Sequence, residues 1–410
     1  MKLSGKLALI AALAFVVCRF GSATMARAAG QSANTASPTH STSAHGCPSQ
    51  DLINSALGKA STMMQQARYR DAAGTLEQLV LLNCDARVSL LLAAAYEAGG
   101  DAPKAQQTLQ KAHSTWPSNS SIAASLAREY MGAGQADKAL DALAHFHATA
   151  QTPLQEMELG VIVYLGGHRL TSAEAVAETA YKSYPSLHTL LMLANVLQLE
   201  GRYPDVNRIL GAKRESYPDS PEFLITLAES EYDASIFPAA RQDIERAVLL
   251  DGKSYQAHYI LANVLVRQNE VDRAVNEYRT AIELAPGQPR TYYQLALTLR
   301  ARQDEAGEMQ ALEQTLAADD HYAPAHYELG RILMDEHRLA DAASHLEVAI
   351  QYNPKAEEAY YLLARVYAGL GEKDKSDEMV KRLVTVRKAN RPSAGNKDGT
   401  PPAATPTMVP

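Results

Sequence analysis

The sequence predicts an all-α protein, a solenoid built from repeated pairs of helices joined by a turn. A leucine followed by a small residue returns about every 34 residues along much of the chain. Apolar residues flank that pair at helical spacing, and turn-forming residues return between them at the same period. Because stacked repeats share one continuous core, this period overrides the two or three domains that 410 residues would otherwise suggest.

The composition is that of a mildly acidic soluble protein. Hydrophobic residues make up 46% and charged residues 21%, and 39 basic against 46 acidic side chains give a formal charge of −7. A nucleic-acid-binding domain normally carries a strongly basic surface. We therefore expect no nucleic-acid partner.

Residues 1–28 have the pattern of a secretory signal peptide. Two lysines precede an eleven-residue apolar run at 7–17, and small residues follow. The run is shorter than the roughly 20 residues that span a bilayer. Cleavage after Ala28 is favoured, cleavage after Ala23 is possible, and an uncleaved anchor is the alternative. We expect export to the periplasm or outside the cell, with no membrane span after cleavage.

Cys18 raises the question of a lipid anchor. A lipoprotein signal needs a small residue directly before the modified cysteine, and here bulky Val17 occupies that place. The sequence therefore favours a cleaved signal over lipidation.

Two segments flank the repeats. Residues 29–49 and 389–410 are rich in Ser, Thr, Ala, Pro and Gly and poor in large apolar side chains. Such segments bury too little surface to offset the entropy lost on ordering. We predict a flexible linker and a disordered tail around a solenoid at 50–388.

The repeats share one phase when the recurring leucine is numbered position 7 of each unit. Positions 4, 7, 8 and 11 form one apolar stripe, and positions 20, 24 and 27 form a second. The leucines are Leu92, Leu126, Leu159, Leu193, Leu227, Leu261, Leu295, Leu329 and Leu363. The units start near 53, 86, 120, 153, 187, 221, 255, 289, 323 and 357. A small residue at position 8 lets a neighbouring helix approach closely.

Turn signals separate the two stripes of each unit. Glycine is frequent near position 15, as at Gly100, Gly134, Gly167, Gly201 and Gly371. Proline or aspartate at position 18 suits the first turn of a second helix. Proline at position 32 ends that helix. Each unit is therefore predicted to be a helix–turn–helix.

This pattern resembles the tetratricopeptide repeat family. Residues 86–388 carry it nine times, and a degenerate tenth unit at 53–85 has Lys59 in place of the leucine. The resemblance implies a right-handed superhelical α-solenoid with a concave surface lined by the first helix of each unit. It also implies a non-catalytic protein that binds partners.

Two places depart from the pattern. The unit that begins at 153 has one extra residue and the preceding unit is one short, so the junction at 145–153 could be a flex point. Glu231 occupies position 11, where the family has a large apolar residue. The packing around Glu231 is therefore uncertain from sequence.

The chain carries no motif of a common catalytic or phosphate-binding site. His258 and His326 occupy position 4 of the first stripe, which favours a packing role over a ligand role. Residues 319–321, Asp-Asp-His, fall between units and suggest a solvated turn. We expect no enzyme activity, no cofactor and no metal.

Cys47 and Cys84 flank the helices of the first unit. In an exported protein an even pair suggests a disulfide. The two ends of an antiparallel helix pair lie side by side, so the predicted bond would staple this unit. Two separate thiols are the alternative.

The concave surface from residue 255 onward is the predicted partner site. Tyrosine and arginine, both enriched at interface hot spots, recur there. The predicted binding residues are Tyr259, Asn263, Arg267, Tyr293, Arg300, Tyr327, Arg331, Tyr361 and Arg365, with Arg290 nearby. The preceding unit presents acidic residues on the same surface: Glu222, Glu229 and Asp233. Alternatively, the tyrosines at position 5 only fill half-buried packing sites.

We therefore predict a protein–protein interaction scaffold of a bacterial cell envelope. Its partner would be a protein or peptide with an extended, partly acidic segment. A glycan- or polymer-binding module is one alternative. An accessory subunit of an envelope secretion, polysaccharide-export or enzyme complex is another. The sequence leaves the partner and the oligomeric state open.

Overall fold

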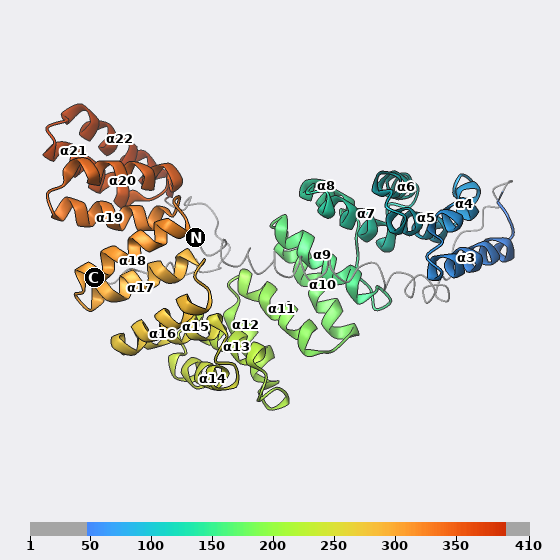
Figure 1. Cartoon of the computed structure of the whole chain (residues 1–410), viewed down its shortest axis with the longest axis horizontal. Helices are drawn as coiled ribbons and strands as arrows, with labels where there is room; N and C mark the ends of the chain where they lie inside the picture. The colour runs from blue at the N-terminus through green and yellow to red at the C-terminus, as the bar shows by residue number, and fades with distance from the viewer. Residues whose placement is uncertain (1–46, 391–410) are drawn as a thin grey trace, which may run out of the picture. The chain divides into compact units, whose positions relative to one another are not determined.

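The computed structural model describes residues 47–390, which form twenty α-helices, α3 to α22, and one 3-10 helix, η2 (Figure 1). Within this range there is no strand, and the predicted all-α helical-repeat fold is confirmed. None of the helices in this range is long and apolar enough to cross a membrane. The predicted signal peptide 1–28, Cys18, residues 29–46 of the linker and residues 391–410 of the tail lie outside the described residues.

The chain divides after Arg202 into two compact units. The first contains α3 Gln50–Gln65, α4 Tyr69–Val80, α5 Ala86–Ala98, α6 Ala102–Thr115, α7 Ser120–Gly132, α8 Ala136–Ala142, α9 Leu154–Gly166, α10 Leu170–Ser183 and α11 Leu187–Leu199. The second contains α12 Tyr203–Gly211, η2 Arg214–Ser216, α13 Pro221–Asp233, α14 Phe237–Leu250, α15 Tyr255–Arg267, α16 Val271–Leu284, α17 Pro289–Ala301, α18 Glu305–Ala318, α19 Ala323–Asp335, α20 Leu339–Tyr352, α21 Glu357–Gly369 and α22 Lys373–Asn390.

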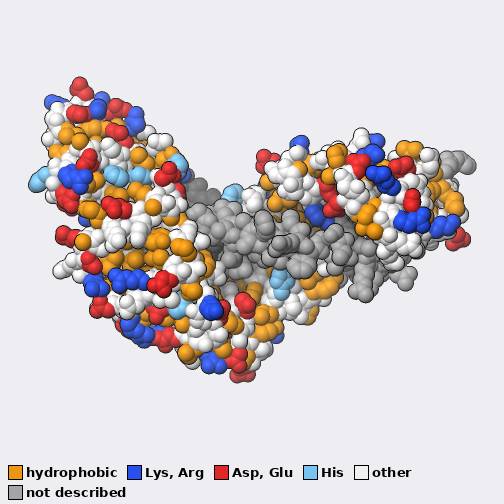
Figure 2. Space-filling view, in the orientation of Figure 1, with side chains coloured by type: hydrophobic (Ala, Val, Ile, Leu, Met, Phe, Trp, Pro, Cys, Tyr) orange, Lys and Arg blue, Asp and Glu red, His pale blue; other side chains and the backbone are white. Residues whose placement is uncertain are grey.

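Within each unit, helices pack against their neighbours in sequence. The contacts of α19 with α20 and of α17 with α18 are among the most extensive, and the contacts of α20 with α21 and of α16 with α17 link successive pairs. Each pair therefore depends on the next one to cover its apolar face, as in other repeat proteins. Acidic and basic side chains are interspersed over the exposed surface (Figure 2).

The recurring leucines and small residues form the core between paired helices. Leu92, Leu261 and Leu363 are buried, as are the other leucines of the series. Gly330 of α19 shows why position 8 must be small. A Cβ atom added there would lie 2.6 Å from Cγ of Leu346 on α20 and 3.3 Å from the carbonyl oxygen of Ala342. The predicted close approach of the two helices is confirmed at this position.

Replacing Gly330 with alanine should therefore destabilise the second unit. Leu346 is fully buried and has little room to move, so overpacking should cost roughly 1–3 kcal/mol. Gly74 of α4 is the matched control, because a Cβ there would meet nothing within 4 Å. Gly74→Ala should leave stability unchanged or raise it by up to about 1 kcal/mol. Urea unfolding followed by circular dichroism measures both variants, and equal midpoints would refute the packing role.

The turn inside each pair has one residue with a left-handed backbone. The positions are Ala67, Gly100, Gly134, His168, Gly201, Ser235, Asn269, Gln303, His337 and Gly371, with φ between 55° and 83°. Glycine adopts this conformation without strain, which explains its recurrence near position 15. In the unit with the extra residue the left-handed residue is His168, one beyond the expected Gly167. Gly167 is instead packed closely, since a Cβ would lie 2.6 Å from Cδ2 of Leu140.

The second helices α8 and α12 are much shorter than fourteen-residue counterparts such as α14 and α20. Helix α8 has seven residues and α12 has nine. After α8, Phe146 is buried in place of a helical residue and its ring lies 3.1 Å from where a Cβ on Gly160 would be. The hydroxyl of Tyr164 donates to the carbonyl of Leu143 at 2.8 Å. The junction at 145–153 is thus non-helical but packed at these points.

Candidate functional site

The predicted partner residues lie on α15, α17, α19 and α21, the first helices of the last four pairs. The structure divides them into residues used inside the fold and residues left at the surface. We call the surface formed by Tyr259, Arg290, Tyr322, Tyr327, Tyr361 and Arg365 the tyrosine–arginine face.

Arg300 and Arg331 form ion pairs inside the fold. Both bind the carboxylate of Glu328, which is only 2% exposed, at 2.6 and 2.8 Å. Arg331 also binds Glu308, a second buried carboxylate, at 2.7 Å. A buried carboxylate without a partner is strongly destabilising. These two guanidinium groups therefore stabilise the packing of α17, α18 and α19. Both charges are thus already paired with buried carboxylates.

Tyr293 and Asn263 also point into the fold. Tyr293 is buried, and its ring lies 5.4 Å from the ring of Tyr322. The side-chain oxygen of Asn263 accepts a hydrogen bond from the hydroxyl of Tyr278 at 2.6 Å. The packing interpretation of position 5 therefore holds for Tyr293.

Arg290 is the central cation of the tyrosine–arginine face. It is exposed at the start of α17, its guanidinium carbon lies 5.5 Å from the ring centre of Tyr259, and it forms no ion pair with any carboxylate of residues 47–390. Partial desolvation opposes its charge, but the phenols of Tyr259 and Tyr322 and the nearby carboxylate of Glu229 raise its pKa. A charged arginine stacked on an aromatic ring and partly desolvated is typical of an interface hot spot.

Tyr259 supports Arg290 from α15. Its ring lies 6.1 Å from that of Tyr278, which is fully buried, so the phenol is held in place. Burial raises the pKa of Tyr259 to about 12. At neutral pH its hydroxyl is therefore protonated and remains a hydrogen-bond donor.

The other end of the face is the most exposed. Tyr361 on α21 is 54% exposed, and the guanidinium carbon of Arg365 lies 5.8 Å from its ring centre. Tyr327 is half-buried against the core around Leu333. Arg267 is exposed, and its guanidinium carbon lies 5.2 Å from the ring centre of Phe237. It is not part of the tyrosine–arginine face. The ring–guanidinium contact between Tyr259 of α15 and Arg290 of α17 thus recurs between Tyr361 and Arg365, here within one helix.

Glu231 is explained by the interrupted second helix that precedes it. Lys213 occupies position 27, where most units have alanine, and α12 ends at Gly211. The following 3-10 helix places Arg214 2.8 Å from Glu231 and 2.6 Å from Asp243. Both acidic residues are buried, with Glu231 5% and Asp243 3% exposed. The charged residue at an apolar position is therefore accommodated by an arginine that the broken helix supplies.

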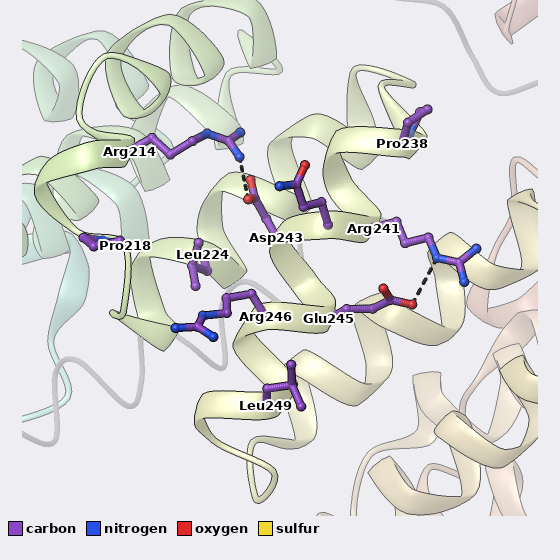
Figure 3. Close-up of a pocket in the computed structure, with 10 residues that line it drawn as sticks. Arg214, Pro218, Leu224, Pro238, Arg241, Asp243, Glu245, Arg246 and Leu249 are labelled. Atoms are coloured by element: carbon purple, nitrogen blue, oxygen red, sulfur yellow. Dashed lines mark hydrogen bonds and ion pairs between the residues drawn. The ribbon is translucent and has the colours of Figure 1, made fainter.

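A pocket of about 600 Å³ lies beside this ion pair (Figure 3). It is lined by Arg214, Pro218, Leu224, Pro238, Arg241, Gln242, Asp243, Glu245, Arg246 and Leu249. Figure 3 shows Arg214 directed at Asp243 and Arg241 at Glu245. Arg246 pairs with Asp219 at 2.5 Å. Because all three arginines have carboxylate partners, the pocket offers no unpaired charge to an anionic ligand.

Cys47 and Cys84 are joined by a disulfide in the structure, with their Cα atoms 5.9 Å apart. Cys47 precedes α3 and Cys84 follows α4, so the bond closes the first helix pair. In α3 only Ile53 and Ala60 are buried, which makes this helix poorly anchored without the bond.

The described residues contain few groups that could bind a metal ion or act in catalysis. Asp319, Asp320 and His321 lie close enough together to share an ion, but Asp320 and His321 are exposed. Proteins of helical repeats of this kind are generally non-catalytic, and the tyrosine–arginine face contains no paired nucleophile and base.

Sequence reasoning missed Tyr322 and underrated Arg290. Tyr322 occupies position 34, directly before α19, and the predicted face counted only positions inside the first helices. Its contact with Tyr293 and its effect on Arg290 require the loop geometry. Examining position 34 of every unit for aromatic residues could have identified Tyr322.

Sequence profiles of the tetratricopeptide repeat match residues 57–120, 225–289, 259–323 and 333–390, which together cover just over half of the chain. A curated relative is the BBSome complex member BBS4 of Bos taurus, 21% identical over 206 residues. That match covers 49% of this chain and 39% of the relative, so the chain spans well under two thirds of the relative's length.

Several solved structures are similar. YrrB, described as a TPR protein with an unusual peptide-binding site, has a TM-score of 0.37 and 18% identity, over 44% of this chain and 93% of YrrB. PilF of Pseudomonas aeruginosa has a TM-score of 0.46 and 16% identity, over 50% of this chain and 92% of PilF. With its repeated helix pairs, its leucine–small core and these profile matches, the chain belongs to the tetratricopeptide repeat family.

Proposed function

We propose that the chain is an interaction scaffold that holds a segment of a partner protein on the tyrosine–arginine face. Tetratricopeptide repeat proteins bind protein or peptide partners. The single observation that carries the proposal is the state of Arg290, which is exposed, charged, stacked on Tyr259 and without a carboxylate partner among residues 47–390.

The chemistry of the face favours an extended segment with an acidic residue beside an aromatic or apolar one. Arg290 and Arg365 each offer a forked donor next to a tyrosine ring. The rings supply rigid contact area, and their hydroxyls supply hydrogen bonds. Arg300 and Arg331, being occupied, would contribute by holding α17 and α19 in register.

We further propose that this scaffold works outside the cytoplasm. The signal-like residues 1–28 support this, and so does the bond between Cys47 and Cys84, because disulfides persist mainly in oxidising compartments. The partner would then be another protein of the envelope.

Selection from a random peptide library on the purified chain tests the binding face. The selected peptides should bind the Arg290→Ala variant at least about tenfold more weakly, because one hot-spot arginine contributes 1.4 kcal/mol or more. Arg246→Ala is the matched control, since Arg246 is an exposed arginine on α14, outside the face. Equal affinity of the wild type and Arg290→Ala for every selected peptide would refute the proposal.

A glycan ligand is the second candidate, favoured by the exposed Tyr361 beside Arg365. The dependence of affinity on salt concentration distinguishes a peptide ligand from a glycan ligand. Binding of an acidic peptide should weaken between 50 and 500 mM salt, whereas binding of a neutral oligosaccharide should change little.

A further inference from the structure

The tyrosine–arginine face borders on two acidic residues of the preceding first helix. Glu229 and Asp233 lie four residues apart near the end of α13, so they share one side of that helix. Helix α13 packs directly against α15, which carries Tyr259. Burial opposes the charge of Arg290, while the phenols of Tyr259 and Tyr322 and the carboxylates of both acidic residues raise its pKa. The two acidic residues of α13 therefore lie near the guanidinium.

Asp233 is close to Arg290 but does not pair with it. Asp233 is half-buried and forms no ion pair or hydrogen bond with any group of residues 47–390. The guanidinium of Arg290 stacks instead on Tyr259, with its central carbon 5.5 Å from the ring centre. Two opposite charges are thus held near each other, and neither neutralises the other by contact. Because a partly desolvated charge without a partner is costly, a ligand that carries both signs would satisfy both groups.

The position of Asp233 is unfavourable for the chain on its own. Asp233 is the last residue of α13, and the last turn of this helix contains no basic residue. The C-terminal end of a helix carries a partial negative charge, so an acidic side chain there is destabilising. The corresponding last residue of α15 is the cation Arg267. A basic side chain supplied by a partner would be attracted both by Asp233 and by the end of α13.

Helix α15 presents two phenols near both charges. Tyr255 and Tyr259 are half-buried. Burial raises the pKa of both phenols, and the charge of Arg290 acts on both in the opposite direction. The carboxylate of Glu229 also acts on Tyr255. Both hydroxyls are therefore protonated at neutral pH, and both rings are available to stack on a basic side chain.

We propose that this part of the face selects a segment that carries both charges, with an acidic residue bound to Arg290 and a lysine or arginine bound to Asp233 beside Glu229. This inference rests on the proposed function and narrows its ligand. A segment with acidic residues alone would be repelled by α13, so Asp233 and Glu229 would determine specificity.

The spacing of the helices sets the spacing of the two charges in the ligand. Neighbouring packed helices lie about 8–10 Å apart. In an extended segment, side chains two residues apart point to the same side and lie about 6.6–6.8 Å apart. The length of a lysine or arginine side chain covers the remaining distance. We therefore expect the basic residue two positions from the acidic one.

Peptides selected from the random library on the wild-type chain provide the test. Those that depend on Arg290 should contain a lysine or arginine two positions from an acidic residue. Their affinity, measured by calorimetric titration, should fall at least about threefold in Asp233→Asn and at least about tenfold in Asp233→Lys, where attraction becomes repulsion. Asp137→Asn is the matched control, because Asp137 is an exposed aspartate of α8 in the first unit, and it should leave the affinity unchanged.

Exchange of the two charges distinguishes direct contact from damage to the fold. A selected peptide whose basic residue is replaced with glutamate should bind Asp233→Lys more tightly than it binds the wild type. The original peptide should show the opposite preference. Circular dichroism verifies that the Asp233 variants keep the helical content of the wild type.

Three results would each overturn the inference while binding at Arg290 persists. They are Arg290-dependent peptides without a basic residue at this spacing, unchanged affinity for Asp233→Asn, and a charge exchange that does not reverse the preference. Failure of the proposed function has a different signature, since every selected peptide would then bind Arg290→Ala as tightly as the wild type. That result would overturn both.

Discussion

Replacing Arg214 with alanine is expected to lower the free energy of unfolding of the second unit by about 3 kcal/mol at neutral pH. Arg214 is the partner of both Glu231 and Asp243, which are 5% and 3% exposed. Removing one member of a buried ion pair costs about 3–5 kcal/mol. The lower figure applies because the Arg214 side chain is itself 38% exposed.

The matched control is Arg246→Ala. Arg246 lines the same pocket, but its partner Asp219 is 65% exposed and Arg246 itself is 51% exposed. Ion pairs at the surface contribute about 1 kcal/mol or less. Urea unfolding should therefore separate the two variants clearly, and similar losses in both would contradict a special role for Arg214.

The pH dependence of the free energy of unfolding provides a second test of the interaction among Arg214, Glu231 and Asp243. Burial, followed by the charge of Asp243, raises the pKa of Glu231 from 4.5 to about 7, and burial also raises the pKa of Asp243. Oε2 of Glu231 and Oδ2 of Asp243 have no donor partner among residues 47–390, so a shared proton would bond them. Between pH 4.5 and 7 the folded state binds more protons than the unfolded state, and stability must fall as the pH rises.

The expected loss across this window is up to about 3 kcal/mol for the wild type. The Glu231→Gln variant should lack most of this slope, because its amide does not titrate. Arg214→Ala should be more damaging at pH 8 than at pH 5, where a proton already neutralises the pair. Parallel stability profiles for the wild type and Glu231→Gln between pH 4.5 and 7.5 would disprove the shared-proton interpretation.

Breaking the disulfide should have the second large effect. Cys47 and Cys84 are 37 residues apart, and closing such a loop stabilises by about 4 kcal/mol in the chain-entropy interpretation. In the Cys47→Ser, Cys84→Ser variant, hydrogen exchange should accelerate in α3 and α4. Because repeat proteins are stabilised mainly by neighbouring contacts, α21 and α22 should keep their protection.

Thiol alkylation of the oxidised, denatured protein is the matching chemical test. No label should reach Cys47 or Cys84 unless the protein is first reduced. Full labelling of both cysteines without reduction would contradict the disulfide between Cys47 and Cys84.

The helix-pair fold could be predicted from sequence because packing between neighbouring repeats leaves a local signature. Leu329 and Gly330 are determined by contacts with the paired helix, and those contacts recur every 34 residues. Glycine near position 15 follows from a left-handed turn that the period also repeats. These features depend on short-range geometry, which the sequence pattern carries directly.

The candidate site could be predicted only in part. The pairing of Arg300 and Arg331 with Glu328 depends on which carboxylate is buried between helices, and the repeat pattern does not encode that. Glu231 is neutralised by Arg214, seventeen residues earlier in the chain, and Arg214 can reach it only because α12 ends at Gly211. Position numbers alone could not distinguish an arginine that neutralises a buried acid from one that remains at the surface.

Photo-crosslinking from position 361 tests the central claim, that the tyrosine–arginine face binds a partner protein, most directly. A photoreactive amino acid would replace Tyr361, which is 54% exposed, in the producing cell, and mass spectrometry would identify the adduct. Leu249, 79% exposed on α14 and outside the face, is the control position. We predict one specific protein adduct from position 361 that disappears when Arg290→Ala is added. An adduct from position 249 alone, or one from 361 that persists without Arg290, would contradict the claim.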